Sequence, residues 1–127
     1  MKTTFLSIIF FILCHMQIKA QYLVAHRGAS FLAPENTVAS AQLAWELGAD
    51  AVEVDVYLSK DGVIMVNHDK DTKRTGGESW VIAETESVQL RKLEVGSYKD
   101  KKYFMVFLHF GEHLQFSTEE FSSSSKK

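Results

Sequence analysis

The segment AVEVDV (51–56) gives the strongest indication of how this chain folds. Its alternating pattern predicts a strand with three valines on one face and with Glu53 and Asp55 together on the other. In an antiparallel sheet with one face in water, the two carboxylates would simply be solvated. In a parallel sheet covered by helices both faces are buried, and two unpaired acids are costly there. The pair would then need a cation.

The residues before this segment favour the parallel alternative. Residues 22–25 (YLVA) form a short apolar run that predicts a buried strand, and this run ends at His26. Residues 37–47 have apolar side chains at helical spacing, and either Asn36 or Thr37 would cap that helix. A strand, a helix and a second strand form a βαβ unit, so the pattern predicts an α/β fold with a parallel sheet.

After this unit, residues 63–67 (VIMVN) repeat the buried-strand pattern and end at His68. Only six residues (57–62) separate the two runs, which is too few for a helical crossover. Either this connection is irregular or the two strands form a local hairpin. Residues 69–79 are polar and predict a loop of the kind that lines a binding or catalytic site. Residues 85–93 predict a helix whose first residue is its cap.

The predicted strand ends bring chemically useful side chains together. If these strands belong to one parallel barrel, His26, His68 and the Glu53/Asp55 pair all emerge at its C-terminal rim. Two imidazoles suit general acid–base catalysis near neutral pH. Two carboxylates suit Ca²⁺ or Mg²⁺, and such a cation together with Arg27 would neutralise a phosphate. Each residue alone has an ordinary structural explanation, but the set predicts phosphoester cleavage.

Several separated motifs resemble the glycerophosphodiester phosphodiesterases over roughly residues 22–102. These motifs are HRGASFLAPENT (26–37), GADAVEVDVYLSKDG (48–62), VNHD (66–69), the RTG that follows, and LEVGSYKD (93–100). The resemblance implies the N-terminal portion of a TIM-type (β/α) barrel of the phospholipase C-like phosphodiesterase class. It also implies hydrolysis of glycerophosphodiesters to an alcohol and glycerol 3-phosphate with a divalent metal, Ca²⁺ or Mg²⁺.

The same resemblance implies roles for seven residues. They are the catalytic acid and base (His26 and His68), two metal ligands (Glu53 and Asp55), a phosphate contact (Arg27) and a loop that shapes the site (Glu35 and Asn36). Two alternatives remain open. One is a phospholipase of the phosphatidylinositol-specific C or sphingomyelinase D type, which shares paired histidines and a barrel. The other is a secreted, non-catalytic protein that keeps the motifs as a relic.

The first twenty residues predict a secretory signal peptide. Lys2 supplies a positive start, residues 5–13 are almost entirely apolar, and Ala20 is a small residue suited to cleavage. We therefore expect an exported protein without a stable membrane span. Cys14 is the single cysteine, so the mature chain would hold no disulfide. A net charge of −2 provides no basic field that would attract nucleic acid or anionic lipid.

The resemblance ends at Lys102, which leaves 21–102 as a partial domain. A complete barrel has about 250 residues, and the family's third metal-binding glutamate, followed by a lysine, is not recognisable here. Residues 103–127 form a non-family tail with a low-complexity end, Ser122–Lys127. In a shifted reading frame the tail permits Gly-(Val/Ile)-Pro-Thr-Leu, the family's motif at this point, which predicts a frameshift near Tyr103. We expect this truncated barrel to have open edges, to fold poorly and to be nearly inactive.

Overall fold

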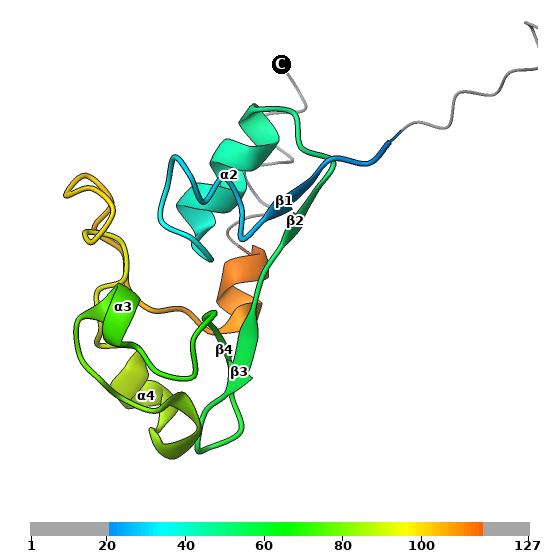
Figure 1. Cartoon of the computed structure of the whole chain (residues 1–127). Helices are drawn as coiled ribbons and strands as arrows, with labels where there is room; N and C mark the ends of the chain where they lie inside the picture. Colours follow the sequence, from blue (N-terminus) through cyan, green and yellow to red (C-terminus); the bar gives the residue numbers. More distant parts are fainter. Residues whose placement is uncertain (1–20, 116–127) are drawn as a thin grey trace, which may run out of the picture.

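The computed structural model describes residues 21–115 (Figure 1). The predicted signal peptide (1–20) and the serine-rich end lie outside the described residues. No helix within 21–115 is long and apolar enough to span a membrane. The elements, in chain order, are β1 (Val24–His26), α2 (Val38–Glu46), β2 (Ala51–Glu53), β3 (Val56–Leu58), β4 (Ile64–Val66), α3 (Lys73–Gly76), a 3₁₀ helix (Ile82–Glu84) and α4 (Ser87–Leu90), followed by helical residues 110–115.

The predicted βαβ unit is confirmed. Strands β1 and β2 pair in parallel, and α2 is the crossover between them (Figure 1). The register places His26 beside Glu53, so the carboxyl ends of both strands lie at the same edge. Thr37 is the N-cap of α2 in a reciprocal capping box, in which Ser40 N–H donates to Thr37 Oγ1 and Thr37 N–H donates to Ser40 Oγ. Thr37, rather than Asn36, therefore begins the helix.

The prediction of one continuous strand over 51–56 is wrong. The strand breaks at residues 54–55: β2 ends at Glu53, and β3 begins at Val56 in a second sheet. Strand β3 pairs with β4 antiparallel, with Val56 opposite Val66, so the hairpin alternative is correct for the short connection. The sequence pattern misleads here because alternation describes side-chain direction, not the partner to which each half of a strand is hydrogen-bonded.

The predicted burial is confirmed for β4, where Met65 and Val66 are buried, but it is wrong for β1 and β3. The side chains of Val24, Val56 and Leu58 are all about half exposed. Each strand has a single partner strand in the described part of the chain, because both sheets are two-stranded, and β4 alone among them has a further bridge, from Met65 to His109. A parallel strand becomes buried on both faces only when further strands and helices cover it, and α2 is the helix packed against β2.

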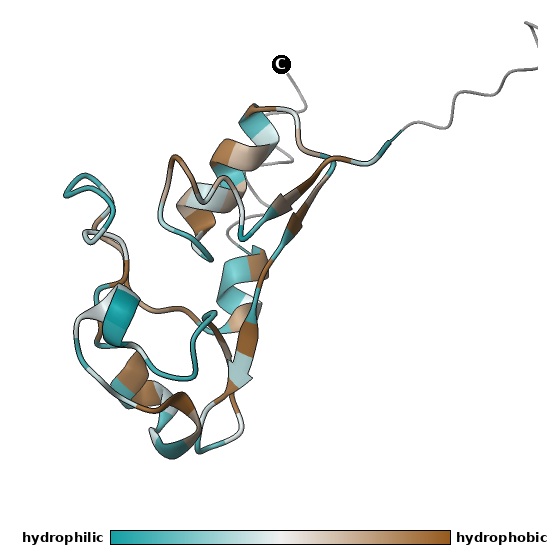
Figure 2. Cartoon of the chain, in the orientation of Figure 1, coloured by the Kyte–Doolittle hydropathy of each residue, from teal (hydrophilic) through white to brown (hydrophobic). Residues whose placement is uncertain are grey.

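The hydrophobic core lies beneath β4 rather than beneath the parallel pair, although β1 and β2 are also largely hydrophobic (Figure 2). Its buried members are Met65, Ile82, Leu90, Leu93, Val95 and Phe107. Phe107 belongs to the tail, and the tail is tied in by two antiparallel bridges, Val106 to Glu94 and His109 to Met65. The described part of the tail is therefore a packed element of the core.

Helix α4 is shorter than predicted. It covers Ser87–Leu90 instead of 85–93, and the Thr85 hydroxyl donates to the carbonyl of Val81 rather than capping the helix. Asp61, in the β3–β4 turn, accepts hydrogen bonds from the N–H and the hydroxyl of Ser87 instead. These bonds and one from the Ser59 hydroxyl hold the pKa of Asp61 well below its usual value. A tertiary contact has replaced the local cap.

Candidate active site

The loop after β1 has an unusual backbone conformation. Arg27 has a φ of 58°, in the left-handed region that a branched or long side chain rarely adopts, and Gly28 follows with a φ of 75°. Three hydrogen bonds fix this turn: Arg27 N–H donates to Glu53 Oε2, and Asn36 N–H and the Ser40 hydroxyl both donate to the Arg27 carbonyl. Left-handed residues other than glycine concentrate at functional sites, where the surroundings hold them in place.

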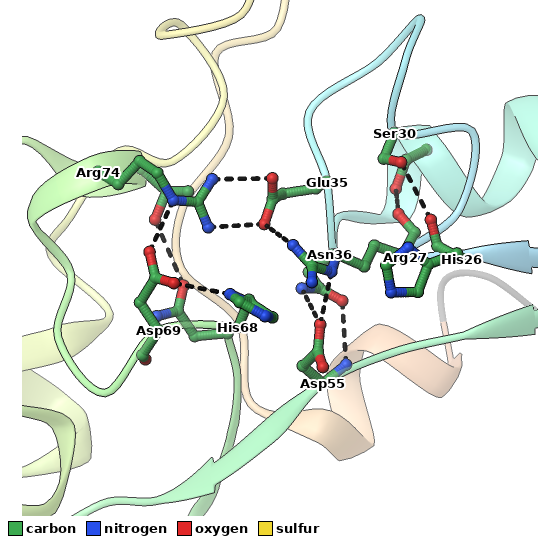
Figure 3. Close-up of polar contacts among 12 residues, drawn as sticks. His26, Arg27, Ser30, Glu35, Asn36, Asp55, His68, Asp69 and Arg74 are labelled. Carbon is green, nitrogen blue, oxygen red and sulfur yellow. Dashed lines mark hydrogen bonds and ion pairs between the residues drawn. The ribbon is translucent and has the colours of Figure 1, made fainter.

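The guanidinium of Arg27 connects two acidic side chains. Its Nε lies 3.0 Å from Asp55 Oδ2, and its Nη1 donates to Glu35 Oε1 at 3.2 Å (Figure 3). The Arg27 side chain is mostly buried. Because its backbone N–H also binds Glu53, Arg27 contacts both carboxylates of the predicted pair. The cation that the Glu53/Asp55 pair was expected to need is thus supplied, in part, by the protein itself.

Asn36 holds Asp55 from the other side. Its side-chain amide donates to Asp55 Oδ2 at 3.1 Å, and its amide oxygen accepts the backbone N–H of Asp55 at the same distance (Figure 3). Asn36 also has a positive φ, 57°, a conformation that asparagine tolerates better than most residues. This reciprocal pair connects the loop before α2 to the break between β2 and β3.

A second arginine, Arg74, joins this loop to the residues that follow β4. It binds Glu35 through two hydrogen bonds of 2.8 Å and Asp69 through one of 2.6 Å (Figure 3). These charge-assisted bonds lower the pKa of Glu35 and of Asp69 and raise that of Arg74. Asp69, Arg74, Glu35, Arg27 and Asp55 therefore form one continuous chain of alternating charges, which we call the ion-pair chain.

The two histidines lie at the two ends of this arrangement. His26 ends β1, and its Nε2 is 3.9 Å from Glu53 Oε2. His68 follows β4, and its Nδ1 lies 2.6 Å from Asp69 Oδ1, which orients the ring and directs Nε2 away from Asp69. Both imidazoles are well exposed to solvent. Both rings are thus accessible and directed by a carboxylate, as an acid–base pair requires.

The structure brings all seven predicted site residues to one corner of the molecule. It adds two residues to which the sequence reasoning assigned no role, Asp69 and Arg74. The signal for them was present, since Asp69 is in the VNHD motif and Arg74 begins the RTG motif. No pattern in the sequence indicates that Arg74 reaches Glu35, because the two residues are 39 positions apart.

The charge of this corner is unbalanced. Glu35, Glu53, Asp55 and Asp69 face only two guanidinium groups, so two negative charges remain when both histidines are neutral. A phosphodiester anion would be repelled unless a further cation were bound. Glu53 and Asp55 are hard oxygen donors, and one or two carboxylates are the usual protein share of a Mg²⁺ site that substrate phosphate completes. Within 21–115, no three potential ligand side chains gather into a full metal cluster.

Behind the site a cleft extends towards the tail. It is lined by residues 35–38, by Asn67 and Thr75, and by tail residues that include His113. His113, in the last described helical residues, is almost completely buried, and its Nε2 has no hydrogen-bond partner. Burial lowers the pKa of this histidine, an effect that the backbone of Thr37 partly opposes. The tail therefore contacts the inner side of the candidate site.

Comparison with known proteins assigns this fold to a class of barrel phosphodiesterases. The sequence profile of the Glycerophosphoryl diester phosphodiesterase family matches residues 26–121. The chain belongs to that family, and its fold is the N-terminal part of the TIM-type barrel. The matched range extends beyond Lys102, into the tail.

Solved structures and relatives agree with this assignment. A phosphodiesterase of Oleispira antarctica, solved in complex with the product sn-glycerol-3-phosphate, is 36% identical with a TM-score of 0.73, over 78% of this chain and 40% of that one. A glycerophosphodiester phosphodiesterase of Agrobacterium tumefaciens is 35% identical with a TM-score of 0.72, over 76% and 42%. The glycerophosphodiester phosphodiesterase of Bacillus subtilis is 41% identical over 81 residues, 63% of this chain and 27% of the relative. The chain thus spans about a third of the length of its curated relatives.

Proposed function

We propose that this chain carries the N-terminal half of the active site of a phosphoric diester hydrolase, which cleaves glycerophosphodiesters into an alcohol and glycerol 3-phosphate. The observation that supports this most is the position of Arg27, which binds Glu53, Asp55 and Glu35 beside His26. A guanidinium fixed at strand ends among acidic groups is suited to orient a phosphate.

The two imidazoles have complementary tasks in this proposal. One deprotonates the attacking hydroxyl, from water or from the adjacent glycerol hydroxyl, and the other protonates the leaving alkoxide. Glu53 keeps His26 near the strand end, and Asp69 orients His68. Arg74 ties His68, through Asp69, to the loop that carries Arg27 and Glu35. Both halves of the acid–base pair are thus positioned by one network.

A divalent cation is part of the proposal, because the family is generally metal-dependent and the corner has surplus negative charge. Glu53 and Asp55 would hold Ca²⁺ or Mg²⁺, which would supply charge neutralisation at the phosphate. Thermal unfolding of the chain with and without each metal tests this. The midpoint should rise with bound metal, because binding to the native state stabilises it, and the rise should vanish in Glu53→Gln and Asp55→Asn. An unchanged midpoint at saturating metal would favour the non-catalytic relic.

A chimera tests the activity independently of the missing barrel. Residues 21–102 would replace the matching segment of the Bacillus subtilis enzyme, and release of glycerol 3-phosphate from glycerophosphocholine would be measured. We expect turnover, with a loss of roughly 10²-fold or more in His26→Ala and in His68→Ala. Lys60→Gln, in the exposed β3–β4 turn, is the matched control and should keep full activity. A folded chimera in which either histidine can be replaced without loss would refute the assigned roles.

Two further measurements in this assay test the phospholipase alternative and the activity of the chain by itself. An intact phospholipid as substrate distinguishes the phospholipase alternative, since a glycerophosphodiesterase should prefer glycerophosphocholine. The unmodified chain, assayed alongside the chimera, tests whether the half-site is nearly inactive by itself.

Export is a separate proposal that rests on residues 1–20, and N-terminal sequencing of the secreted protein would detect cleavage after Ala20.

A further inference from the structure

The loop that links β1 to α2 has an exposed apolar tip. Phe31 is 89% exposed and Leu32 is 52% exposed, although both are large hydrophobic residues. The same loop begins with His26 and Arg27 and ends with Glu35, so the tip and the candidate site belong to one segment. An apolar tip in water is unfavourable for a loop unless it contacts something else.

A second loop, residues 97–103, is attached to this tip at two points. Lys99 Nζ donates to the carbonyl of Ser30 at 3.0 Å, and Glu35 N–H donates to the Tyr98 hydroxyl at 3.2 Å. Lys99 Nζ also lies 5.9 Å from the centre of the Phe31 ring, within range of a cation–π contact. In Figure 2 the middle of the β1–α2 loop is hydrophobic between hydrophilic ends, and the 97–103 loop is largely hydrophilic.

The second loop is rich in lysine, and Lys99 brings a positive charge to the apolar tip. Lys101 and Lys102 follow Lys99, all three are exposed, and Asp100 is the single acid among them. Lys102 lies 4.8 Å from the Tyr103 ring centre and 3.9 Å from Asp100. The segment thus carries two net positive charges, and one of its lysines, Lys99, lies beside Phe31. The net charge of the whole chain, −2, still gives no long-range attraction to an anionic surface.

We propose that Phe31, Leu32, Lys99, Lys101 and Lys102 form a lipid-contact patch that binds the surface of a phospholipid bilayer. The argument is charge complementarity at short range. Phe31 and Leu32 would enter the boundary between headgroups and acyl chains, while the lysine ammonium groups stay at the level of the lipid phosphates. This contact would place the site of His26 and Arg27 at the height of phospholipid headgroups. It stands independently of the proposed hydrolysis.

Vesicle co-sedimentation of the full chain tests the apolar part of the patch. The vesicles are phosphatidylcholine alone or phosphatidylcholine mixed with phosphatidylglycerol, and no substrate is present. Phe31→Ala should weaken binding about tenfold, because it removes a large buried apolar surface. Tyr22→Ala is the matched control: Tyr22 is another highly exposed aromatic, beyond the opposite end of β1, and its replacement should leave binding unchanged. Residues 1–20 are the same in every variant.

The charged part of the patch predicts a smaller effect that salt should mimic. Lys101→Gln with Lys102→Gln should weaken binding to the anionic vesicles about fivefold per lysine, whereas Lys60→Gln with Lys92→Gln should not. Raising NaCl from about 0.1 M to about 1 M shortens the Debye length from about 10 Å to about 3 Å and should reproduce the loss. Binding that is absent, or equal in the wild type and Phe31→Ala at equal thermal midpoints, overturns the proposal. Turnover is not measured in this experiment, so the vesicle result remains valid even if the hydrolase proposal fails.

Discussion

The corner that holds the ion-pair chain and the core around Phe107 are stabilised by different interactions. The corner is held by charge-assisted hydrogen bonds among partly exposed side chains, and contacts there also keep Arg27 and Asn36 in left-handed conformations. The core is held by burial of apolar side chains, including one from the tail. The difference implies that the site geometry depends on a few directional contacts, whereas the stability of the chain depends on burial. Mutations should therefore affect site geometry and overall stability separately.

The largest expected effect is in the core. Phe107 is 1% exposed, so Phe107→Ala should lower the free energy of unfolding by about 3–5 kcal/mol through lost burial and the cavity left behind. Phe104→Ala, three residues earlier and 78% exposed, should change it by less than about 0.5 kcal/mol. Urea denaturation of both variants measures the difference. Equal values for the two would show that the tail is not part of the core.

The next effect concerns the turn at the site. A Cβ on Gly28 would lie 2.6 Å from the carbonyl carbon of Ser40, whereas a Cβ on Gly48 would meet nothing within 4 Å. Both glycines have a positive φ, so both alanine variants suffer the left-handed strain of about 1 kcal/mol. Gly28→Ala should cost about 1–3 kcal/mol more through overpacking. Denaturation of the two variants isolates the steric part, and an equal loss would contradict the close approach to Ser40.

The ion-pair chain should contribute less, and its contribution should depend on pH. Arg74→Gln should cost about 1 kcal/mol at neutral pH, because Arg74 is partly exposed and solvent screens its pairs. The depressed pKa of Glu35 means that this stabilisation is complete above the unfolded value, 4.5, and is lost as the pH falls through the folded value. Unfolding free energies measured across this acid range should therefore fall less steeply in Arg74→Gln. A parallel pH profile would argue against the pairing.

The smallest effect should come from His113, in a different pH range. Because its folded pKa is below the usual 6.5, the unfolded chain binds a proton that the folded chain does not once the pH falls below 6.5. Stability should decline there, above the range in which Glu35 titrates. His113→Asn should flatten this part of the profile. Identical slopes in the wild type and in His113→Asn would show that His113 is not protected from protonation.

Much of the site followed from the sequence because its residues sit next to strand ends. His26 ends β1, Glu53 ends β2 and His68 lies two residues after β4, so the strand patterns placed them without tertiary information. Asp69 and Arg74 could not be assigned roles, because their partners depend on how two loops meet. The break at Val54 and Asp55 was missed for a similar reason: each half of that segment pairs with a different strand.

The sequence and the structure answer different questions about the tail, its origin and its packing. The frameshift near Tyr103 stays a prediction that the nucleotide sequence would decide. The structure shows that the described part of this tail packs Phe107 against Met65 whatever its origin. Apolar composition is enough for such packing, because burial is non-directional and tolerates many sequences.

The sequence by itself determined the βαβ unit and the family, and it singled out seven residues that the structure brings together, because side-chain periodicity and motifs act over short distances. Only the tertiary structure decided the hairpin of β3 and β4, the location of the core beneath β4, and the exposed faces of the strands. It also decided that Arg74 joins His68 and Asp69 to Arg27 through Glu35. Burial and ion pairing depend on which segments meet in space, and a linear pattern does not carry that information.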